Sequence, residues 1–135
     1  MLPLGAMGSS RSQGRSAWRL SDQLRAEVLK LTRRLPIDAD QRLREQLDDA
    51  AAAASRRISE AFMTERPQDF ARFIRLSRAS VDEVQEGIRL VLLKRMCVES
   101  DLRDLQEILS RLYPALSLLL VSQQPRTHRA IKQSS

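Results

Sequence analysis

The sequence has very little cysteine and histidine, and each scarcity excludes a class of function. Cys97 is the only cysteine, so the chain can form no internal disulfide and no zinc site of the Cys-x-x-Cys type. His128 is the only histidine, and it lies in a polar stretch near the C-terminus where nothing is expected to orient it. The sequence also lacks a nucleophile elbow, a P-loop and a glycine-rich dinucleotide turn. We therefore expect no enzyme, no cofactor, no metal site and no small-molecule substrate.

Long apolar runs are missing as well. The longest, over residues 115–121, spans seven residues with one serine among them, whereas a membrane helix needs about 20 apolar residues. The first residues lack the apolar segment of a signal peptide. A single cysteine suits a reducing compartment, so we expect a cytoplasmic protein without membrane contact.

Glycine, proline and aromatic residues are scarce, and the common residues are helix formers: alanine, leucine, arginine, glutamate and glutamine. The period-two pattern of β-strands is absent. Apolar residues recur instead every three or four positions, which predicts amphipathic helices. These helices are expected over about residues 17–35, 40–64, 68–95 and 101–122. Because their connections are short, neighbours should be antiparallel, which predicts an all-α, up-down-up-down four-helix bundle.

Two of these segments predict how the helices pack. The second contains five consecutive alanines, residues 50–54, whose small side chains favour a seam where a neighbouring helix approaches closely. Near the end of the third segment, apolar residues extend most of the way round the helix. A helix that is apolar all round is buried by its own fold or by another subunit, so these residues suggest self-assembly. They are Ile88, Leu90, Val91, Leu92 and Leu93.

The formal net charge of +6 is carried by the two ends of the chain. Residues 1–19 and 124–135 contain basic residues and no acid, whereas residues 20–123 contain 17 basic and 17 acidic residues. The sequence pI of 10.6 therefore describes the tails and does not by itself indicate a basic face on the bundle. We divide the chain into a bundle over residues 17–123 and two disordered basic tails, 1–16 and 124–135.

Two clusters of arginine are the candidate nucleic-acid contacts. Arginine accounts for 20 of the 23 basic residues, and its guanidinium group suits bidentate contact with phosphate. The clusters occupy the second and third predicted helices and should lie near the same end of the bundle. The alternative is that they form solvated faces balanced by nearby acids. The candidate residues are Arg56, Arg57, Arg72, Arg75 and Arg78.

Three stretches carry a resemblance to a known family: REQLDDAA over residues 44–51, RISEA over 57–61 and DFARFIRLSRASVDEV over 69–84. Between residues 42 and 116 the chain resembles the four-helix bundle family of bacterial 23S rRNA intervening-sequence proteins, which includes the accessory variability determinant of diversity-generating retroelements. The third stretch is the most specific, because it matches in apolar, basic and small positions over sixteen residues. Two basic positions of the family become Asp48 and Asp49 here, which weakens a nucleic-acid face on the second helix.

The resemblance implies a ring-shaped homo-oligomer, typically a pentamer, with an accessory role beside RNA or a reverse transcriptase. It also implies that Arg57, Arg72, Arg75 and Arg78 contact phosphate, and that Glu60 and Glu83 form structural polar pairs. We therefore expect a non-enzymatic, oligomeric accessory protein that binds RNA or a nucleic-acid enzyme. The alternative is a protein–protein interaction scaffold without nucleic-acid binding.

Overall fold

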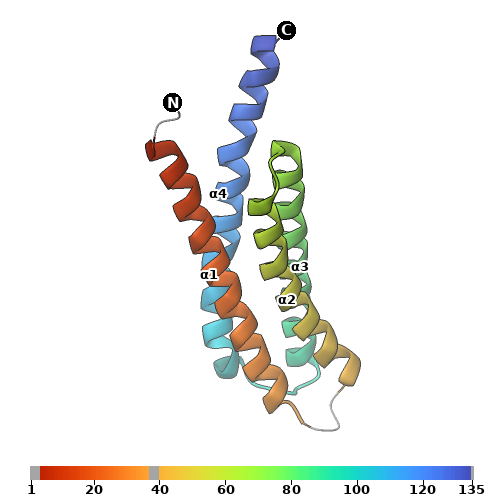
Figure 1. The fold of residues 1–135 in the computed structure, drawn as a ribbon. Coiled ribbons are helices and arrows are strands. Elements are labelled where there is room, and N and C mark those ends of the chain that lie inside the picture. The colour runs from red at the N-terminus through yellow and green to blue at the C-terminus, as the bar shows by residue number, and fades with distance from the viewer. Residues whose placement is uncertain (1–3, 37–39, 135) are drawn as a thin grey trace.

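The protein is an antiparallel bundle of four α-helices with a short 3-10 helix before the last of them (Figure 1). The computed structural model describes the backbone of residues 4–36 and 40–134 and the side chains of residues 12–36 and 40–121. These residues form no strand, and the predicted fold class is confirmed. The elements are α1 (Leu4–Arg34), α2 (Gln41–Met63), α3 (Pro67–Leu93), η1 (Glu99–Leu102) and α4 (Arg103–Ser134).

The predicted helix bounds hold at the connections and are wrong at the outer ends. Helix α1 begins at Leu4 and not near residue 17, and α4 ends at Ser134 and not near residue 122. No proline interrupts the chain between the ends of α1, so the helix can propagate through the polar residues before the bundle core. The expected disorder of residues 1–16 and 124–135 concerns the chain in solution and stays a prediction.

Each connection between helices has a local cause. The Asp40 carboxylate accepts a hydrogen bond from the backbone N–H of Leu43 at 3.2 Å and so caps the first turn of α2. Pro67 begins α3, where its missing N–H has no partner to lose. At the other end of α3, the N–H of Met96 donates to the carbonyl of Val91 at 3.0 Å, and Arg95 takes a left-handed φ of 55°. Both features are typical of a Schellman helix ending.

Helices α2 and α3 meet in the close-packed seam that the alanine run predicts. Buried small residues of α2 face α3, and the Ser77 hydroxyl donates a 2.8 Å hydrogen bond to the carbonyl of Ala54. Nearly three turns further along α3, a Cβ on Gly87 would lie 2.4 Å from Cδ2 of Leu47 on α2, which leaves no room for a side chain. The seam therefore sets the separation of the two helices and their register.

Arg44 and Asp48 join α2 to α1. The Arg44 guanidinium donates hydrogen bonds of 2.6 Å to the carbonyls of Thr32 and Pro36, which are free of helical partners at the end of α1. The Thr32 hydroxyl lies 2.8 Å from Oδ1 of Asp48, to which it can donate. Asp48 therefore faces α1, so this carboxylate bears on packing between helices more than on an outer binding face.

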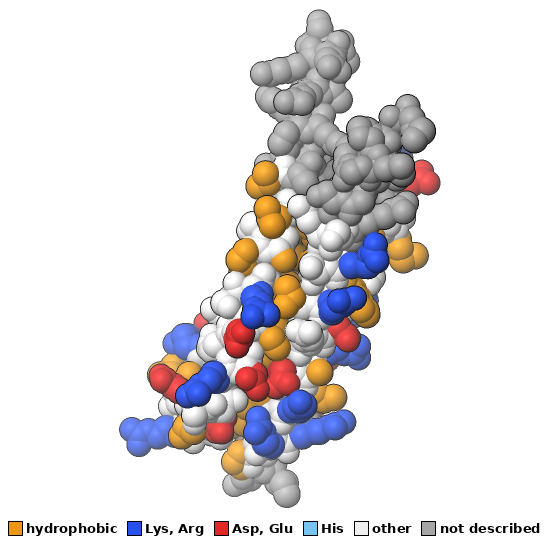
Figure 2. All heavy atoms as spheres, turned by 90° about the vertical axis from the view of Figure 1, so that its left-hand side faces the viewer, with side chains coloured by type: hydrophobic (Ala, Val, Ile, Leu, Met, Phe, Trp, Pro, Cys, Tyr) orange, Lys and Arg blue, Asp and Glu red, His pale blue; other side chains and the backbone are white. Residues whose placement is uncertain are grey.

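The apolar residues near the end of α3 are mostly buried by the protomer itself. Ile88 and Val91 are buried, Leu90 and Leu92 are half-buried, and only Leu93 is largely exposed. Self-assembly through this segment stays a prediction, because α2 and α4 of the same protomer already contact α3 and most of these side chains are at least half-buried without a second subunit. Viewed onto α1 and α4, apolar side chains form a stripe along the bundle, with charged side chains of both signs gathered toward one end (Figure 2).

We expect the Gly87→Ala variant to be less stable than the parent protein. The new methyl group would press on Leu47, which is fully buried and cannot swing into solvent. Overpacking of this kind costs about 1–3 kcal/mol, and alanine's better helix propensity offsets up to about 1 kcal/mol of it. Urea denaturation should therefore show a free energy of unfolding lower by about 1–2 kcal/mol.

The matched control is Gln85→Ala, which changes an exposed residue two positions earlier on the same helix. Its effect should stay within about 0.5 kcal/mol. A Gly87→Ala protein as stable as the parent would contradict the close approach of α2 and α3.

Candidate nucleic-acid interface

All five candidate arginines lie in the half of the bundle that contains the turn between α2 and α3. Arg56 and Arg57 precede that turn and the other three follow it, and the antiparallel pairing brings them to the same level. Two contacts show how α2 and α3 are aligned. The rings of Phe62 and Phe70 meet edge to face with their centroids 5.1 Å apart, and the Ser77 hydroxyl donates a hydrogen bond to the carbonyl of Ala54. The expectation that both clusters share one end of the bundle is therefore correct.

This half of the bundle is more basic than the other, and we call it the basic end. It comprises residues 12–22, 53–80 and 113–121, which contain eight basic and four acidic residues. Residues 23–36, 40–52 and 81–112 contain eleven basic and twelve acidic residues. The near neutrality of the bundle thus hides a separation of charge along its length. Both termini also point to the basic end (Figure 1).

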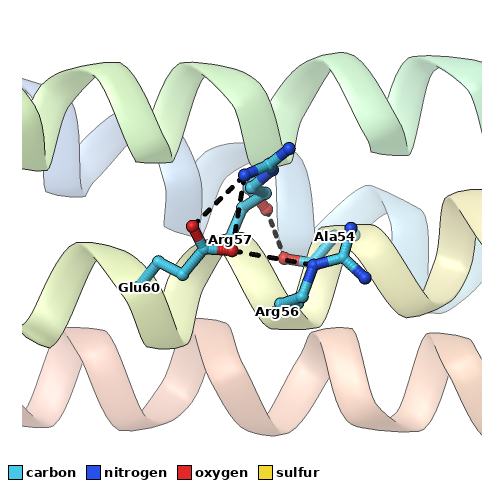
Figure 3. A network of polar contacts seen from close by, with 5 residues as sticks. Ala54, Arg56, Arg57 and Glu60 are labelled. Carbon is cyan, nitrogen blue, oxygen red and sulfur yellow. Dashed lines mark hydrogen bonds and ion pairs between the residues drawn. The ribbon is translucent and has the colours of Figure 1, made fainter.

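Glu60 forms ion pairs with two of the five candidate arginines. Its Oε2 lies 3.2 Å from Nη1 of Arg57, and its Oε1 lies 3.6 Å from Nε of Arg56. Figure 3 shows Glu60 on the same face of α2 as both guanidinium groups, with that of Arg57 directed toward α3. Glu60 therefore forms the polar pairs that the resemblance implies. Because all three side chains are at least partly exposed, these pairs orient the arginines more than they stabilise the fold.

The arginines of α3 are less neutralised. Nη2 of Arg72 lies 3.8 Å from Oδ1 of Asp69, and its guanidinium carbon lies 5.0 Å from the centroid of the Phe73 ring. Within the described residues, Arg75 and Arg78 form no hydrogen bond or ion pair with another side chain. Successive residues three apart on a helix differ by about 60° in direction, so the three arginines fan across the outer surface of α3.

Tyr113 of α4 is a polar residue of this region that sequence reasoning missed. Its hydroxyl donates a 2.6 Å hydrogen bond to Oδ1 of Asp82 on α3. Burial, followed by this hydrogen bond and the charge of Asp82, raises the pKa of Tyr113, while nearby Arg78 lowers it. No local pattern marks the pair, because its members lie 31 positions apart and meet only when α3 and α4 pack.

Glu83 does not fulfil the role that the resemblance implies. It is exposed, and it makes no hydrogen bond or ion pair with the residues that the structure describes. Its position points away from both neighbouring helices, whereas Asp82, one position earlier, reaches Tyr113. The carboxylate that links α3 to another helix here is therefore Asp82.

The described residues contain no group of three or more histidine, cysteine, aspartate or glutamate side chains that could hold a metal ion. Burial, reinforced by the charge of Asp101, raises the pKa of the Cys97 thiol, which disfavours the reactive thiolate. The side chain of His128 lies outside the described residues. Among the helices that were described, none combines the length and apolar character needed to cross a membrane.

Trp18 and Phe62 line a second feature of the basic end that sequence reasoning missed. They border a groove of about 520 Å³ between α1 and α2, together with Gly14, Arg15, Ile58 and Ser59. Both rings are about two-fifths exposed. Residues 14–18 of α1 form one wall of this groove, and Gly14 and Arg15 fall within the tail that the sequence predicts to be disordered.

The chain matches one model of a known protein family. A family model described as 23S rRNA-intervening sequence protein matches residues 15–117, which include most of α1, all of α2 and α3, and the first half of α4. No curated protein matches the chain. The match begins at Arg15, so it includes every residue that lines the groove except Gly14.

We expect Tyr113 to resist ionisation. An ordinary tyrosine is half ionised near pH 10, whereas burial and the Asp82 carboxylate both favour the neutral phenol. Tyrosinate absorbance should therefore appear only well above pH 10, and it reports this residue alone because the chain has a single tyrosine.

The Asp82→Asn variant should move the onset of this absorbance to lower pH, since it removes a negative charge beside the phenol. Asp69→Asn, which changes a carboxylate on the same helix without a contact to Tyr113, should leave the titration unchanged. Circular dichroism at each pH would verify that the protein stays folded. A midpoint near pH 10 in the parent protein would contradict the contact.

Proposed function

Since this chain belongs to the family of 23S rRNA-intervening sequence proteins, we propose that it is a non-catalytic accessory protein that binds RNA through the basic end of its bundle. The family description names a ribosomal RNA element and no reaction. The described residues contain no candidate metal cluster, and their one cysteine is partly buried with a raised pKa. A binding function is the interpretation that these features support best.

The separation of charge along the bundle is the observation that carries the proposal. Eight basic residues against four acidic ones give the basic end an attraction for phosphate that the opposite end lacks. Four further basic residues and no acid lie in residues 1–11 and 122–135, at the two ends of the chain. The helices that contain them, α1 and α4, have their free ends at the basic end, so their charge adds to that of the bundle.

The arginines divide into two kinds of contact. Arg75 and Arg78 form no ion pair among the described side chains, so phosphate can approach them without displacing one. Arg56 and Arg57 share Glu60, which lowers their net charge but holds their guanidinium groups in place. A preordered guanidinium loses less conformational freedom on binding a phosphate.

We also propose that the protein acts as a homo-oligomer, as a pentamer by its resemblance to the accessory proteins of diversity-generating retroelements. Leu118 and Val121 of α4 are large apolar residues that are 53% and 59% exposed. An apolar stripe also runs along the α1 and α4 face of the bundle (Figure 2). Large apolar side chains in such a stripe favour association between subunits. In this role the oligomer would present several basic ends to RNA or to a reverse transcriptase.

The second candidate is a protein–protein interaction scaffold without nucleic-acid binding. The same apolar stripe supports it, and so does the neutralisation of Arg56 and Arg57 by Glu60. The two candidates differ in whether the basic end matters for binding.

Reversing the charge of Arg72 and Arg75 should weaken RNA binding by more than tenfold. Each reversal removes a phosphate contact and adds a repulsive charge, so the salt dependence should also flatten by about two units of slope in a plot of log affinity against log salt. Fluorescence anisotropy with a labelled RNA of about 20 nucleotides, at about 50 to 200 mM salt, would measure both quantities.

The matched control reverses Arg33 and Arg103, which are exposed and lie at the opposite end of the bundle. It makes the same change in net charge and should alter RNA affinity much less. Equal loss in both variants would indicate nonspecific attraction to total charge. No loss in either variant would favour the scaffold.

Light scattering of the full chain should give a molar mass about five times the 15.4 kDa of one protomer. Leu118→Glu should lower that mass, because a charge in place of this exposed apolar side chain of α4 would have to be buried between subunits. A monomer at micromolar concentration would remove the oligomeric part of the proposal and leave RNA binding to be judged by the arginine variants.

A further inference from the structure

The groove between α1 and α2 combines aromatic rings with positive charge. Its walls are Trp18 and Phe62, its floor is the fully buried Ile58, and Arg15 borders it from α1. None of the described residues that line it is acidic. The volume of about 520 Å³ falls in the usual range of a small-molecule site.

The groove exists because Gly14 has no side chain. A Cβ at that position would lie 2.2 Å from Cζ of Phe62, so the Phe62 ring packs directly against the backbone of α1. Phe70 holds the ring from the other side in an edge-to-face contact at 5.1 Å. Phe62 is therefore fixed in place while 42% of it remains exposed, and Trp18, one turn beyond Gly14, is 43% exposed.

Arginine surrounds this apolar surface. Arg15 lies three positions before Trp18, and Arg19 lies four positions after Arg15, so the three are neighbours on the surface of α1. On α2, the exposed Arg56 lies three positions before Ser59, which also borders the groove. Arg15 and Arg19 form no ion pair among the described side chains. Charge of this sign beside exposed rings complements a ligand that has both a flat aromatic face and a phosphate.

We propose that this groove binds an unpaired base of single-stranded RNA, with the base against Trp18 and Phe62 and the flanking phosphates at Arg15, Arg19 and Arg56. Aromatic side chains that stack on bases inside a basic channel are the usual means of binding single strands. Bases in an RNA duplex are already stacked and its major groove is too narrow for side chains, so a duplex cannot fill the site. The inference deepens the proposed RNA binding and rests on it for the class of ligand.

Trp18 is the only tryptophan of the chain, so its fluorescence reports the groove directly. Titration of the full protein with a single-stranded uridine oligomer of about 12 nucleotides should quench this fluorescence to saturation. A duplex of the same length, bound through phosphate alone, should leave the emission almost unchanged.

Phe62→Ala should lower the affinity for the single strand by roughly tenfold, measured by anisotropy of the labelled oligomer, and should change duplex affinity less than about twofold. Ser59→Glu is a second variant that places a negative charge at the edge of the groove on an exposed position, without removing a packed ring. It should weaken single-strand binding as well. Val98→Ala, which removes an exposed apolar side chain just before η1 at the opposite end of the bundle, is the matched control and should have no effect.

Two patterns would overturn the inference and leave the proposed function standing. In the first, reversal of Arg72 and Arg75 weakens RNA binding while Trp18 emission and the groove variants show no effect. In the second, Trp18 emission shifts with protein concentration in the absence of RNA, which would identify a second copy of the chain as the occupant. Loss of single-strand binding in the groove variants alone would support the groove and contradict binding through α3. Absence of RNA binding in every experiment would overturn both.

Discussion

The hydrogen bond from the Ser77 hydroxyl to the Ala54 carbonyl belongs to the seam on which the rest of the structure depends. This seam is narrow because α2 offers alanines and α3 offers Ser77 and Gly87, and the absence of larger side chains lets the backbones approach. A narrow seam tolerates no slip in register, because Leu47 fills the space that a side chain at position 87 would need. That register decides which arginines of α2 and α3 lie at the same height along the bundle.

Charge in this bundle is organised by topology. A count over residues 20–123 is neutral, yet an up-down arrangement folds the chain so that the second half of α2 and the first half of α3 share one end. Those two segments contain most of the basic excess, while the acids of α3 and α4 lie mainly at the other end. Residues 20–123 are therefore neutral in total, yet the bundle that they form has one basic end. The free ends of α1 and α4 point to that same end.

Two kinds of residue give this end its character. The arginines of α2 and α3 are long, at least partly exposed and only partly paired, which suits contact with a phosphate backbone. Trp18 and Phe62 are each about two-fifths exposed, and Phe62 is held by Gly14 and Phe70, which suits contact with a base. Their placement at one end of the bundle joins both chemistries on a continuous stretch of α1, α2 and α3.

The helical pattern was readable from the sequence because amphipathic spacing and helix propensity are local properties. Leu24, Val28 and Leu31, with the corresponding residues of the other helices, are buried as their spacing predicts. The caps at Asp40 and Pro67 are local too, and they set the starts of α2 and α3 to within a residue. Where no such signal exists, at the outer ends of α1 and α4, the predicted bounds were wrong.

The sequence by itself determined four helices, their order and the small residues that let two of them approach. Only the tertiary structure decided which charged and aromatic side chains meet. Tyr113 reaches Asp82, Arg44 reaches the end of α1, and Phe62 rests on Gly14, each across a gap in sequence that carries no periodic signal. The physical reason is that helix formation depends on neighbours three and four positions apart, whereas a surface between helices depends on how far apart and at what level their backbones pack.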